Sequence, residues 1–508
     1  MKWYNQSSLF ICLFGIGFTP LSLLSQNQNL PINQSFSFDI DNAIVGSSKI
    51  VHESFKPILA SEARKVDSNL FLSPTLNNLL FNNKRFVSRK LFYEHFISLD
   101  TGNILLTIDP LVNFELGEDF KEEREDINRY YKNTRGFNLK LSIGDKVSFE
   151  SSFLENQAVL PYYLDLRAKN SNVVFGQGRW KSFGDNGYDY AMASGYFSYS
   201  IANWVTLQAG HGKHFIGNGH RSLLLSDLSF NYPYIRLITS WFNNKLQYQT
   251  LLSSYQNLNR LQSADPSEGL FERKQAASHY IEYSPSSSFS FAFFESVVFP
   301  TITSTGNKPV GVNFWIPIIG LNSLIEGKGS MGNILWGTNM KYNLFKKIQL
   351  YNQVSVLDEN FDKLSIQLGG KLFLANSFLI QFEGNKIGKS IENNLFHHYN
   401  ESLTHPLLEN TTELLGLIQF KQNRFISRLS YNLISSDAID IQYLDLKQSV
   451  IINPTFNFAF NIGIQYRMES AQNENLSSTL ALPLARDEES IFFYVGISTN
   501  LQNLYFDY

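Results

Sequence analysis

The chain has 508 residues and a net charge of −3; 15% of its residues are aromatic, with 43 Phe and 25 Tyr, and only 17% are charged. This balance gives no electrostatic footprint for nucleic acid, and it is unusual for the surface of a soluble domain. Mean hydropathy is −0.16, and beyond the leader no apolar run is long enough to cross a bilayer as a helix. These features together favour a transmembrane β-barrel, in which one face of each strand meets lipid and the other meets water.

The first residues have the pattern of a secretory signal peptide. Lys2 supplies the positive charge, residues 9–18 the apolar stretch and residues 23–26 a suitable cleavage region. We therefore expect residues 1–25 to be a signal peptide and the protein to be exported to the cell outer membrane. The single cysteine, Cys12, lies in this leader, so the mature chain has no thiol for disulfides, metal binding or nucleophilic catalysis.

Residues 26–100 are predicted to form a short N-terminal periplasmic or plug-like segment. The first part is rich in Asn and Ser and has weak periodicity, with one short helix expected near residues 61–66. The prediction is that this segment packs under or into the barrel, and a partly disordered lead-in is the alternative.

From about residue 104 onward, apolar and polar residues alternate with the period of a strand. The alternation is clearest in residues 191–201, 364–372 and 456–467. The strands of a soluble β-sandwich alternate in the same way. The connections between strands are therefore needed to distinguish a sandwich from a membrane barrel.

Two kinds of connection alternate along the chain. Short hairpins are predicted at Gly144-Asp145, Ala202-Asn203, Asn243-Asn244, Pro285-Ser286, Phe345-Lys346 and Asn423-Arg424. Longer polar connections are predicted within residues 156–189, 257–278, 300–331, 385–410 and 468–490. Short turns on one rim and long loops on the other are typical of outer-membrane barrels. We therefore predict an all-β fold, a transmembrane antiparallel β-barrel of about 18 strands over residues 101–508.

The chain ends with Leu504, Phe506 and Tyr508 on one face of a predicted last strand. A terminal aromatic residue on such a strand resembles the signal that is read by the barrel-insertion machinery. That machinery and the lipids of the outer membrane are therefore expected partners, whereas nucleic acid is not.

Residues 207–236 concentrate glycines and basic side chains between two alternating stretches. The candidate ligand-binding residues here are His211, Lys213, His214, His220, Arg221, Ser222 and Asp227. A charge at membrane depth on the lipid face costs about 2–4 kcal/mol, so this stretch is predicted to fold toward the lumen or one mouth. Its donors would suit a hydroxyl-rich or anionic ligand. The alternative is a basic loop folded inward and bonded to internal carboxylates and water.

The same stretch resembles the outer-membrane barrel family of the capsule-assembly protein Wzi, and within it the RemB branch of gliding bacteria. The shared run G-H-G-K-x-F-I-G-x-G-x-R-S-L-L-L-S-D, followed by Y-P-Y, stands at residues 210–227 and 232–234. Further similar runs lie at residues 89–96, 107–112, 133–136, 188–191, 294–299, 332–337 and 398–407. The chain differs from the capsule proteins where Phe215, Ile216, Gly217 and Asn218 replace Trp-Gly-Pro, and where Leu228-Ser229 replaces Asn-Ala.

This resemblance implies a role at the cell surface. It implies retention or organisation of surface polysaccharide, as in capsule assembly, or support of surface adhesion and gliding motility, with motility or secretion proteins as further partners. The main alternative is an outer-membrane channel or transporter for small solutes. Loop aromatics could stack on sugar rings, but we expect most of them in the outer aromatic girdle; they are Tyr162, Tyr163, Trp180, Phe183, Tyr188 and Tyr190.

Catalysis and metal binding are the other uses that these residues could have. His220 as base, Ser222 as nucleophile and Asp227 as orienting carboxylate would suit a hydrolase, but the sequence shows no local oxyanion motif. His211 and His214 are three residues apart, a poor spacing for metal ligands on a strand, and His397 and His398 are adjacent. We therefore predict no enzymatic activity, no metal site and no cofactor.

Overall fold

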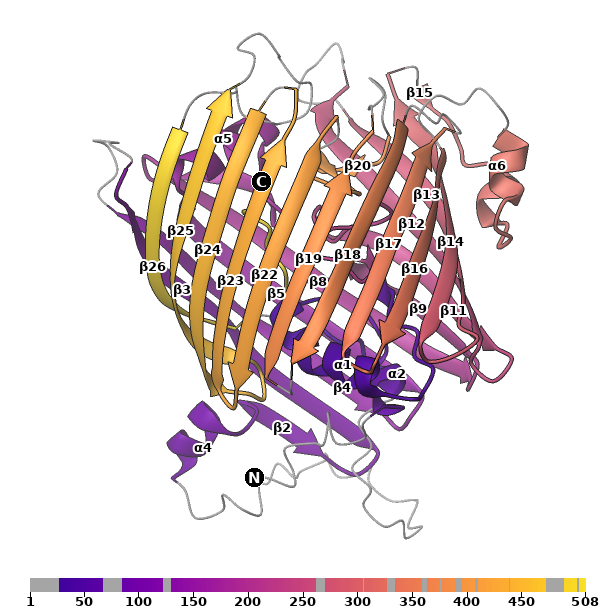
Figure 1. Cartoon of the computed structure of the whole chain (residues 1–508), viewed down its shortest axis with the longest axis horizontal. Helices are drawn as coiled ribbons and strands as arrows, with labels where there is room; N and C mark the ends of the chain where they lie inside the picture. The colour runs from indigo at the N-terminus through magenta and orange to yellow at the C-terminus, as the bar shows by residue number, and fades with distance from the viewer. Residues whose placement is uncertain are drawn as a thin grey trace, which may run out of the picture.

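The structure is a computed structural model that describes residues 27–66, 85–121, 129–261, 270–304, 306–326, 334–358, 363–374, 377–388, 395–406, 410–437, 439–471, 488–499 and 502–508. The expected signal peptide, residues 1–25, lies outside the described residues. The described chain forms a closed antiparallel barrel of 18 wall strands (Figure 1), as the sequence predicts. No helix in the described part of the chain is long and apolar enough to cross a bilayer.

Each wall strand pairs with its neighbours in chain order, and the last closes the ring by pairing with the first. The wall strands are β3 (Ile104–Asp119), β4 (Tyr130–Ile143), β5 (Val147–Val159), β8 (Gly187–Ala202), β9 (Val205–Gly212), β11 (Tyr232–Trp241), β12 (Leu246–Arg260), β13 (Phe271–Tyr283), β14 (Phe289–Thr303), β16 (Ile334–Leu344), β17 (Ile348–Leu357), β18 (Leu364–Leu374), β19 (Phe378–Lys386), β22 (Thr412–Gln422), β23 (Phe425–Ser435), β24 (Ile439–Asn453), β25 (Phe458–Ala471) and β26 (Glu488–Thr499). Closure satisfies the backbone groups that an open edge would leave unpaired in lipid.

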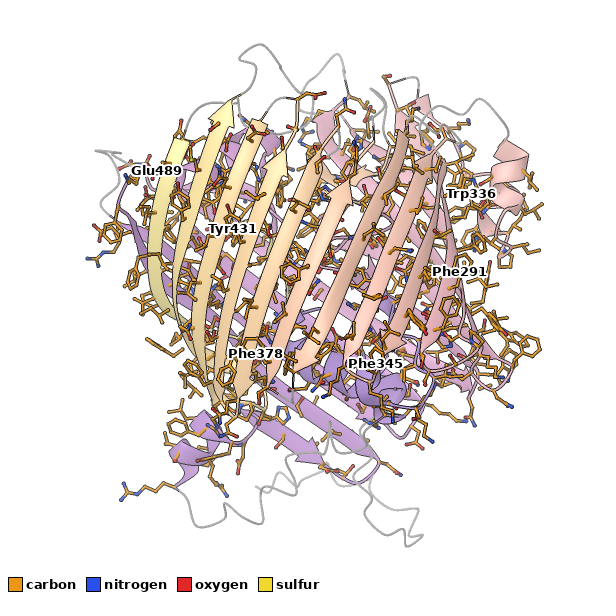
Figure 2. The ribbon with its side chains drawn as sticks, in the orientation of Figure 1. Phe291, Trp336, Phe345, Phe378, Tyr431 and Glu489 are labelled. Atoms are coloured by element: carbon orange, nitrogen blue, oxygen red, sulfur yellow. The ribbon has the colours of Figure 1, made fainter. Side chains whose placement is uncertain are left out.

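The predicted alternation is present in the wall. On β18, Ile366 and Leu368 are exposed on the outer face, whereas Gln367 and Lys371 are buried in the lumen. The six predicted hairpins all connect neighbouring strands, with the second turn at Asn203-Trp204 because β8 extends to Ala202. Aromatic side chains lie on the outer surface near the short-turn rim, as Figure 2 shows for Phe345 and Phe378.

Residues 27–66 pack against the lumenal face of the wall near the short-turn rim (Figure 1). They form α1 (Gln34–Gly46), β1 (Phe55–Lys56) and α2 (Ala60–Arg64), and β1 pairs with β10 (Phe215–Ile216). Charged side chains of the segment meet charged wall residues: Asp41 bonds Lys371 at 2.8 Å, and Glu53 bonds Lys341 at 2.7 Å. The segment is therefore joined to the wall by buried ion pairs as well as by apolar packing.

The remaining helices and strands either precede the wall in sequence or lie in the loops between wall strands. α4 (Phe86–Phe92) and β2 (Ile97–Asp100) precede the wall, and β2 pairs with β3. The long-loop rim carries α5 (Tyr162–Ser171), β6 (Val173–Val174), β7 (Gly178–Phe183), β15 (Gly306–Asn307), η2 (Val312–Trp315), α6 (Leu321–Glu326), β20 (His397–His398) and β21 (Glu401–Ser402). β9 and β11 are shorter than their neighbours because the chain between them turns into the lumen. β9 pairs with residues 195–202 of β8, and β7 pairs with residues 187–190 of the same strand.

Three sequence-based expectations are wrong. The last strand ends at Thr499, and residues 502–508 form no strand; instead, Tyr505 and Tyr508 are buried in the lumen. The loop aromatics do not form mainly an outer girdle, because Tyr163, Tyr188 and Tyr190 are buried in a cluster around α5. The strand expected from residue 456 begins at Phe458, after a turn in which Asn457 has a φ of 55°.

Candidate functional site

The connection between β9 and β11, residues 213–231, crosses the lumen and is buried from His214 to Ser229. Wall side chains hold its backbone: Gln353 on β17 accepts from the Leu223 N–H at 2.8 Å, and Glu383 on β19 accepts from the Arg221 N–H at 3.0 Å. Gly217 has a φ of 136°, a conformation that residues with a side chain rarely adopt. The predicted inward folding of this stretch is confirmed.

Arg221 is the centre of a buried ionic cluster. Its Nη2 lies 2.9 Å from Oε1 of Glu413 on β22, and its Nη1 lies 3.0 Å from Oδ1 of Asp507 near the C-terminus. Burial opposes the charge of Arg221, but the two carboxylates outweigh it and raise the pKa of the guanidinium. Burial likewise opposes the charge of Asp507, and Arg221 with His220 outweighs it and lowers the pKa of that carboxyl. The fork of Arg221 is thus occupied by internal carboxylates.

The two residues beside Arg221 also have partners within the chain. His220 contacts Gln34 of α1 through Nδ1 and Asp507 through Nε2, each at 3.0 Å. Ser222 donates to the Ile216 carbonyl at 2.5 Å and accepts from the N–H groups of Leu224 and Leu225 at 3.2 Å. His220 therefore connects residues 27–66 to the C-terminal residues, and Ser222 stabilises a turn of the chain.

The remaining predicted residues divide between the same segment and β9. Asp227 accepts from the Tyr505 hydroxyl at 2.8 Å, and burial raises the pKa of its carboxyl. Lys213 donates to the Gly176 carbonyl at 2.7 Å, and burial lowers the pKa of its amine. His214 is fully buried beside Tyr232, and His211, on β9, contacts the Ala193 carbonyl at 3.0 Å.

These contacts can be compared with the hydrolase and the metal site that the sequence analysis considered. His220, Ser222 and Asp227 each bond a different partner rather than one another. Within the ranges that the structure describes, no group of three or more His, Cys, Asp or Glu side chains is placed to hold a metal ion. The seven predicted residues are brought into one region, but as parts of an internal network.

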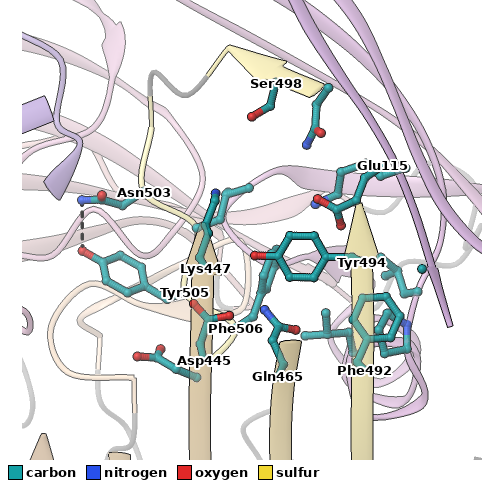
Figure 3. A pocket seen from close by; sticks show the side chains of 18 of the residues that line it. Glu115, Asp445, Lys447, Gln465, Phe492, Tyr494, Ser498, Asn503, Tyr505 and Phe506 are labelled. Carbon is teal, nitrogen blue, oxygen red and sulfur yellow. Dashed lines mark hydrogen bonds between the residues drawn. The ribbon is translucent and has the colours of Figure 1, made fainter. Parts of the chain in front are cut away.

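A cavity of about 230 Å³ lies beside this network, between the C-terminal residues and the wall formed by β3, β4 and β23–β26. Its lining extends from Leu160 and Pro161, before α5, to Ser498 near the end of β26. The aromatic residues of the lining are Tyr130, Tyr131, Tyr443, Phe492, Tyr494, Tyr505 and Phe506. Figure 3 shows Asp445, Lys447 and Gln465 close together, with Tyr494 and Phe492 beside them.

The cavity is lined by charged groups of both signs. Asp507 is paired with Arg221 and His220, and Lys132 lies over the Phe506 ring, 5.0 Å from its centroid. Glu115, Asp445 and Lys447 also line the cavity, and Lys447 is attracted by both of these carboxylates. Arg428 donates to Gln34 at 2.6 Å. The cavity thus combines aromatic rings with donors, acceptors and charges of both signs, which is the make-up of a site for a polar ligand.

Among solved structures, the chain is similar to Wzi from Escherichia coli, described as an outer membrane protein involved in group 1 capsule assembly and a carbohydrate-binding β-barrel. The match has 12% identity and a TM-score of 0.55, and it covers 92% of this chain and 98% of that one. The chain has the fold of an outer-membrane β-barrel. Identity this low shows a shared fold and no more.

Two Pseudomonas aeruginosa barrels are more distant. OpdL matches at 11% identity with a TM-score of 0.43, over 78% of this chain and 98% of its own. OpdK, solved with vanillate, matches at 9% identity with a TM-score of 0.44, over 77% of this chain and 97% of its own. Neither the protein-family models nor the curated proteins contain a match to this chain.

Sequence reasoning did not find the cavity residues. Most of them come from β3, β4, β23–β26 and the C-terminal residues, which are far apart in the chain, and only His220 belongs to the glycine-rich stretch. A signal was nevertheless present, because Asp445 and Lys447 are two residues apart on an alternating strand and therefore share its lumenal face. His220 is the one predicted residue that lines the cavity.

Proposed function

We propose that the protein is a non-enzymatic outer-membrane barrel that binds polysaccharide at the cell surface, in capsule attachment or assembly or in surface gliding motility. The observation that supports this most directly is the cavity between the C-terminal residues and β23–β26, with its aromatic and charged lining. Aromatic faces pack on the apolar faces of sugar rings, while amides, hydroxyls and charges bond sugar hydroxyl groups. Wzi, which shares the fold, is described as a carbohydrate-binding barrel.

The contents of the lumen favour binding over free diffusion. Residues 27–66 and 213–231 bond the wall from inside, and Asp507 in the C-terminal residues bonds Arg221 and Asn432. Displacing these segments would break the buried ion pairs of Glu413 with Arg221 and of Lys341 with Glu53, which is unfavourable. The alternative function is an outer-membrane channel for small solutes. Its passage would then run along the side of the barrel where the cavity lies.

One pair of measurements separates the two functions. The purified barrel is tested for binding to polysaccharide extracted from the surface of its own cells, and the same preparation is tested for conductance in planar bilayers. We expect saturable glycan binding with little conductance. High conductance without glycan binding would replace the proposal by the channel.

The process that the binding serves needs a test in cells. We expect a deletion strain to lose retained surface polysaccharide or the ability to glide, and the loss to be restored by the wild-type gene. A strain that keeps both would contradict a surface-polysaccharide role.

A further inference from the structure

Four wall residues place polar groups on the outer face of the barrel. On β12, β13 and β14, lumenal positions are identified by contacts with the interior: Tyr280 packs against Phe55 of β1, with ring centroids 5.6 Å apart. His279, the neighbour of Tyr280, therefore faces outward. Its cross-strand partners are Thr250 and Glu295, which face outward with it, as does Tyr248 on β12.

These polar groups lie at membrane depth. Glu295 is six residues along β14 from Phe289, at the short-turn end. At about 3.3 Å per residue and a tilt of about 40°, this places it roughly 15 Å above that end, inside an apolar band about 25 Å tall. A carboxylate facing lipid at this depth is unfavourable unless something covers it.

The segment of residues 306–326 supplies that cover from the outside. Glu295 accepts from the N–H groups of Gly320 at 2.5 Å and Ser323 at 3.0 Å, and it bonds the Ser323 hydroxyl. Tyr248 accepts from the Ile319 N–H at 3.0 Å and donates to the Pro317 carbonyl at 2.9 Å. The polar groups of the wall thus bond the inner side of this segment.

An apolar contact holds the same segment further along the wall. Phe314 of η2 is buried against Ala277, Val297, Phe299 and Ile334, which are outward-facing residues of β13, β14 and β16. Figure 1 shows α6 outside the barrel wall, on the side of β13 and β14. The segment is therefore packed onto the outer surface at two places, one polar and one apolar.

The other side of the segment is apolar and exposed. Val312 is 86% exposed and Leu324 79% exposed, and Trp315, Ile318 and Ile325 are also exposed. On a barrel in water this would be an unfavourable surface. Here it continues the lipid-facing surface of the wall, on which residues such as Phe293 and Leu350 are exposed in the same way.

We propose that residues 312–325 are a membrane-embedded side arm, which covers the Tyr248–His279–Glu295 group and inserts Val312, Trp315, Ile318, Leu324 and Ile325 among the acyl chains of the outer leaflet. The long-loop origin of the segment selects the outer leaflet, because long loops of such barrels are extracellular. The occupant of this surface is lipid, since the surface is continuous with the lipid-facing wall.

The test places a nitroxide label at position 324. The only cysteine of the sequence, Cys12, lies in the expected leader, so Leu324→Cys gives a single labelling site in the mature protein. The variant is reconstituted into phosphatidylcholine–phosphatidylglycerol vesicles, and collisions of the label with oxygen and with a water-soluble nickel chelate are measured. Leu368→Cys on the outer face of β18 is the lipid control, and Lys346→Cys in a short turn is the water control.

We expect the label at position 324 to show the high oxygen and low nickel collision rates of the label at position 368. Nickel collisions as frequent as at position 346 would overturn the proposal, because the arm would then lie in water. Low collision rates with both reagents would also overturn it, because a second copy of the chain would then cover the arm. Adding Phe314→Ala, which leaves the lumen untouched, is expected to raise the nickel collisions at position 324; no change would show that wall packing does not hold the arm.

Discussion

Arg221 and Glu413 form a buried ion pair across 192 residues of sequence, with both side chains at most 2% exposed. The same guanidinium bonds Asp507, and Glu413 also bonds His405 at 2.8 Å. The pair thus connects the lumen-crossing segment, the wall and the C-terminal residues. The charge of the buried guanidinium is thus neutralised by carboxylates of the protein itself. We infer that this cluster stabilises the fold of the lumen.

Arg221→Gln should therefore destabilise the barrel. The change leaves Glu413 and Asp507 without their common cation, and breaking a buried pair in this way costs about 3–5 kcal/mol. The measurement is the urea dependence of the heat-modifiable migration of the folded barrel. Arg221→Lys, which keeps the charge but loses the two-bond contact, should fall between the variant and the wild type. Wild-type stability of Arg221→Gln would show that the cluster is not structural.

Deleting residues 505–508 should leave an assembled barrel. β26 ends at Thr499 and already pairs with β3, from Phe492 with Asp119 to Ser498 with Asn113, so closure does not use the deleted residues. The loss of the buried ion pair of Asp507 with Arg221 should lower stability by about 3–5 kcal/mol. Folded material is measured by heat-modifiable migration in outer-membrane fractions. Its absence would mean that assembly requires the C-terminal residues, as the sequence pattern alone suggested.

The wall could be predicted because its pattern is local. Alternation such as Ile366-Gln367-Leu368 follows from one face meeting lipid and the other meeting the lumen, and it needs no knowledge of distant residues. The C-terminal pattern of Leu504, Phe506 and Tyr508 is equally alternating, yet Leu504 and Phe506 line the cavity and Tyr508 is buried. Five residues can alternate by chance, and the sequence does not show that Asp507 has a buried cation to meet.

The site could be predicted only in part, because its contacts are between distant residues. The glycines and basic residues of 207–236 indicated an inward fold, but Asp227 bonds Tyr505 across 278 residues. Glu295 is a different case, because it stands at an outward position between Phe293 and Val297. This break in an apolar face is present in the sequence, but none of the predictions from the sequence used it.

Glu401→Gln should remove a loss of stability that the wild type shows as pH rises from about 4.5 to about 8. Burial raises the pKa of the Glu401 carboxyl to about 8, so the folded state holds its proton more tightly than the unfolded state does. The stability from this group is present at low pH and is lost as pH rises toward and through about 8. Each unit of pKa shift corresponds to about 1.4 kcal/mol, and the nearby amine of Lys213 offsets part of the loss.

The measurement is the free energy of unfolding in urea between about pH 5 and pH 9. The variant keeps an acceptor for the Gly176 N–H, which Glu401 bonds at 2.9 Å, so it should fold and show a flatter profile. Glu489→Gln, at an exposed carboxylate, is the control and should follow the wild type. Parallel profiles of Glu401→Gln and the wild type would contradict a buried, protonated Glu401.

Lys447→Gln and Tyr494→Ala should each weaken glycan binding while leaving a folded barrel. Lys447 lines the cavity without an ion pair in the described ranges, and a hydrogen bond from a charged donor contributes about 1.5–3 kcal/mol, or roughly tenfold or more in affinity. Tyr494 also lines the cavity, and its ring lies over Gly463, where a Cβ atom would be 2.4 Å from Cζ of the tyrosine. Tyr431→Ala, on the outer face of β23 (Figure 2), is the matched control and should bind as the wild type does. Equal losses in all three variants would point to general destabilisation, whereas unchanged affinity in the two cavity variants would place the glycan elsewhere on the barrel.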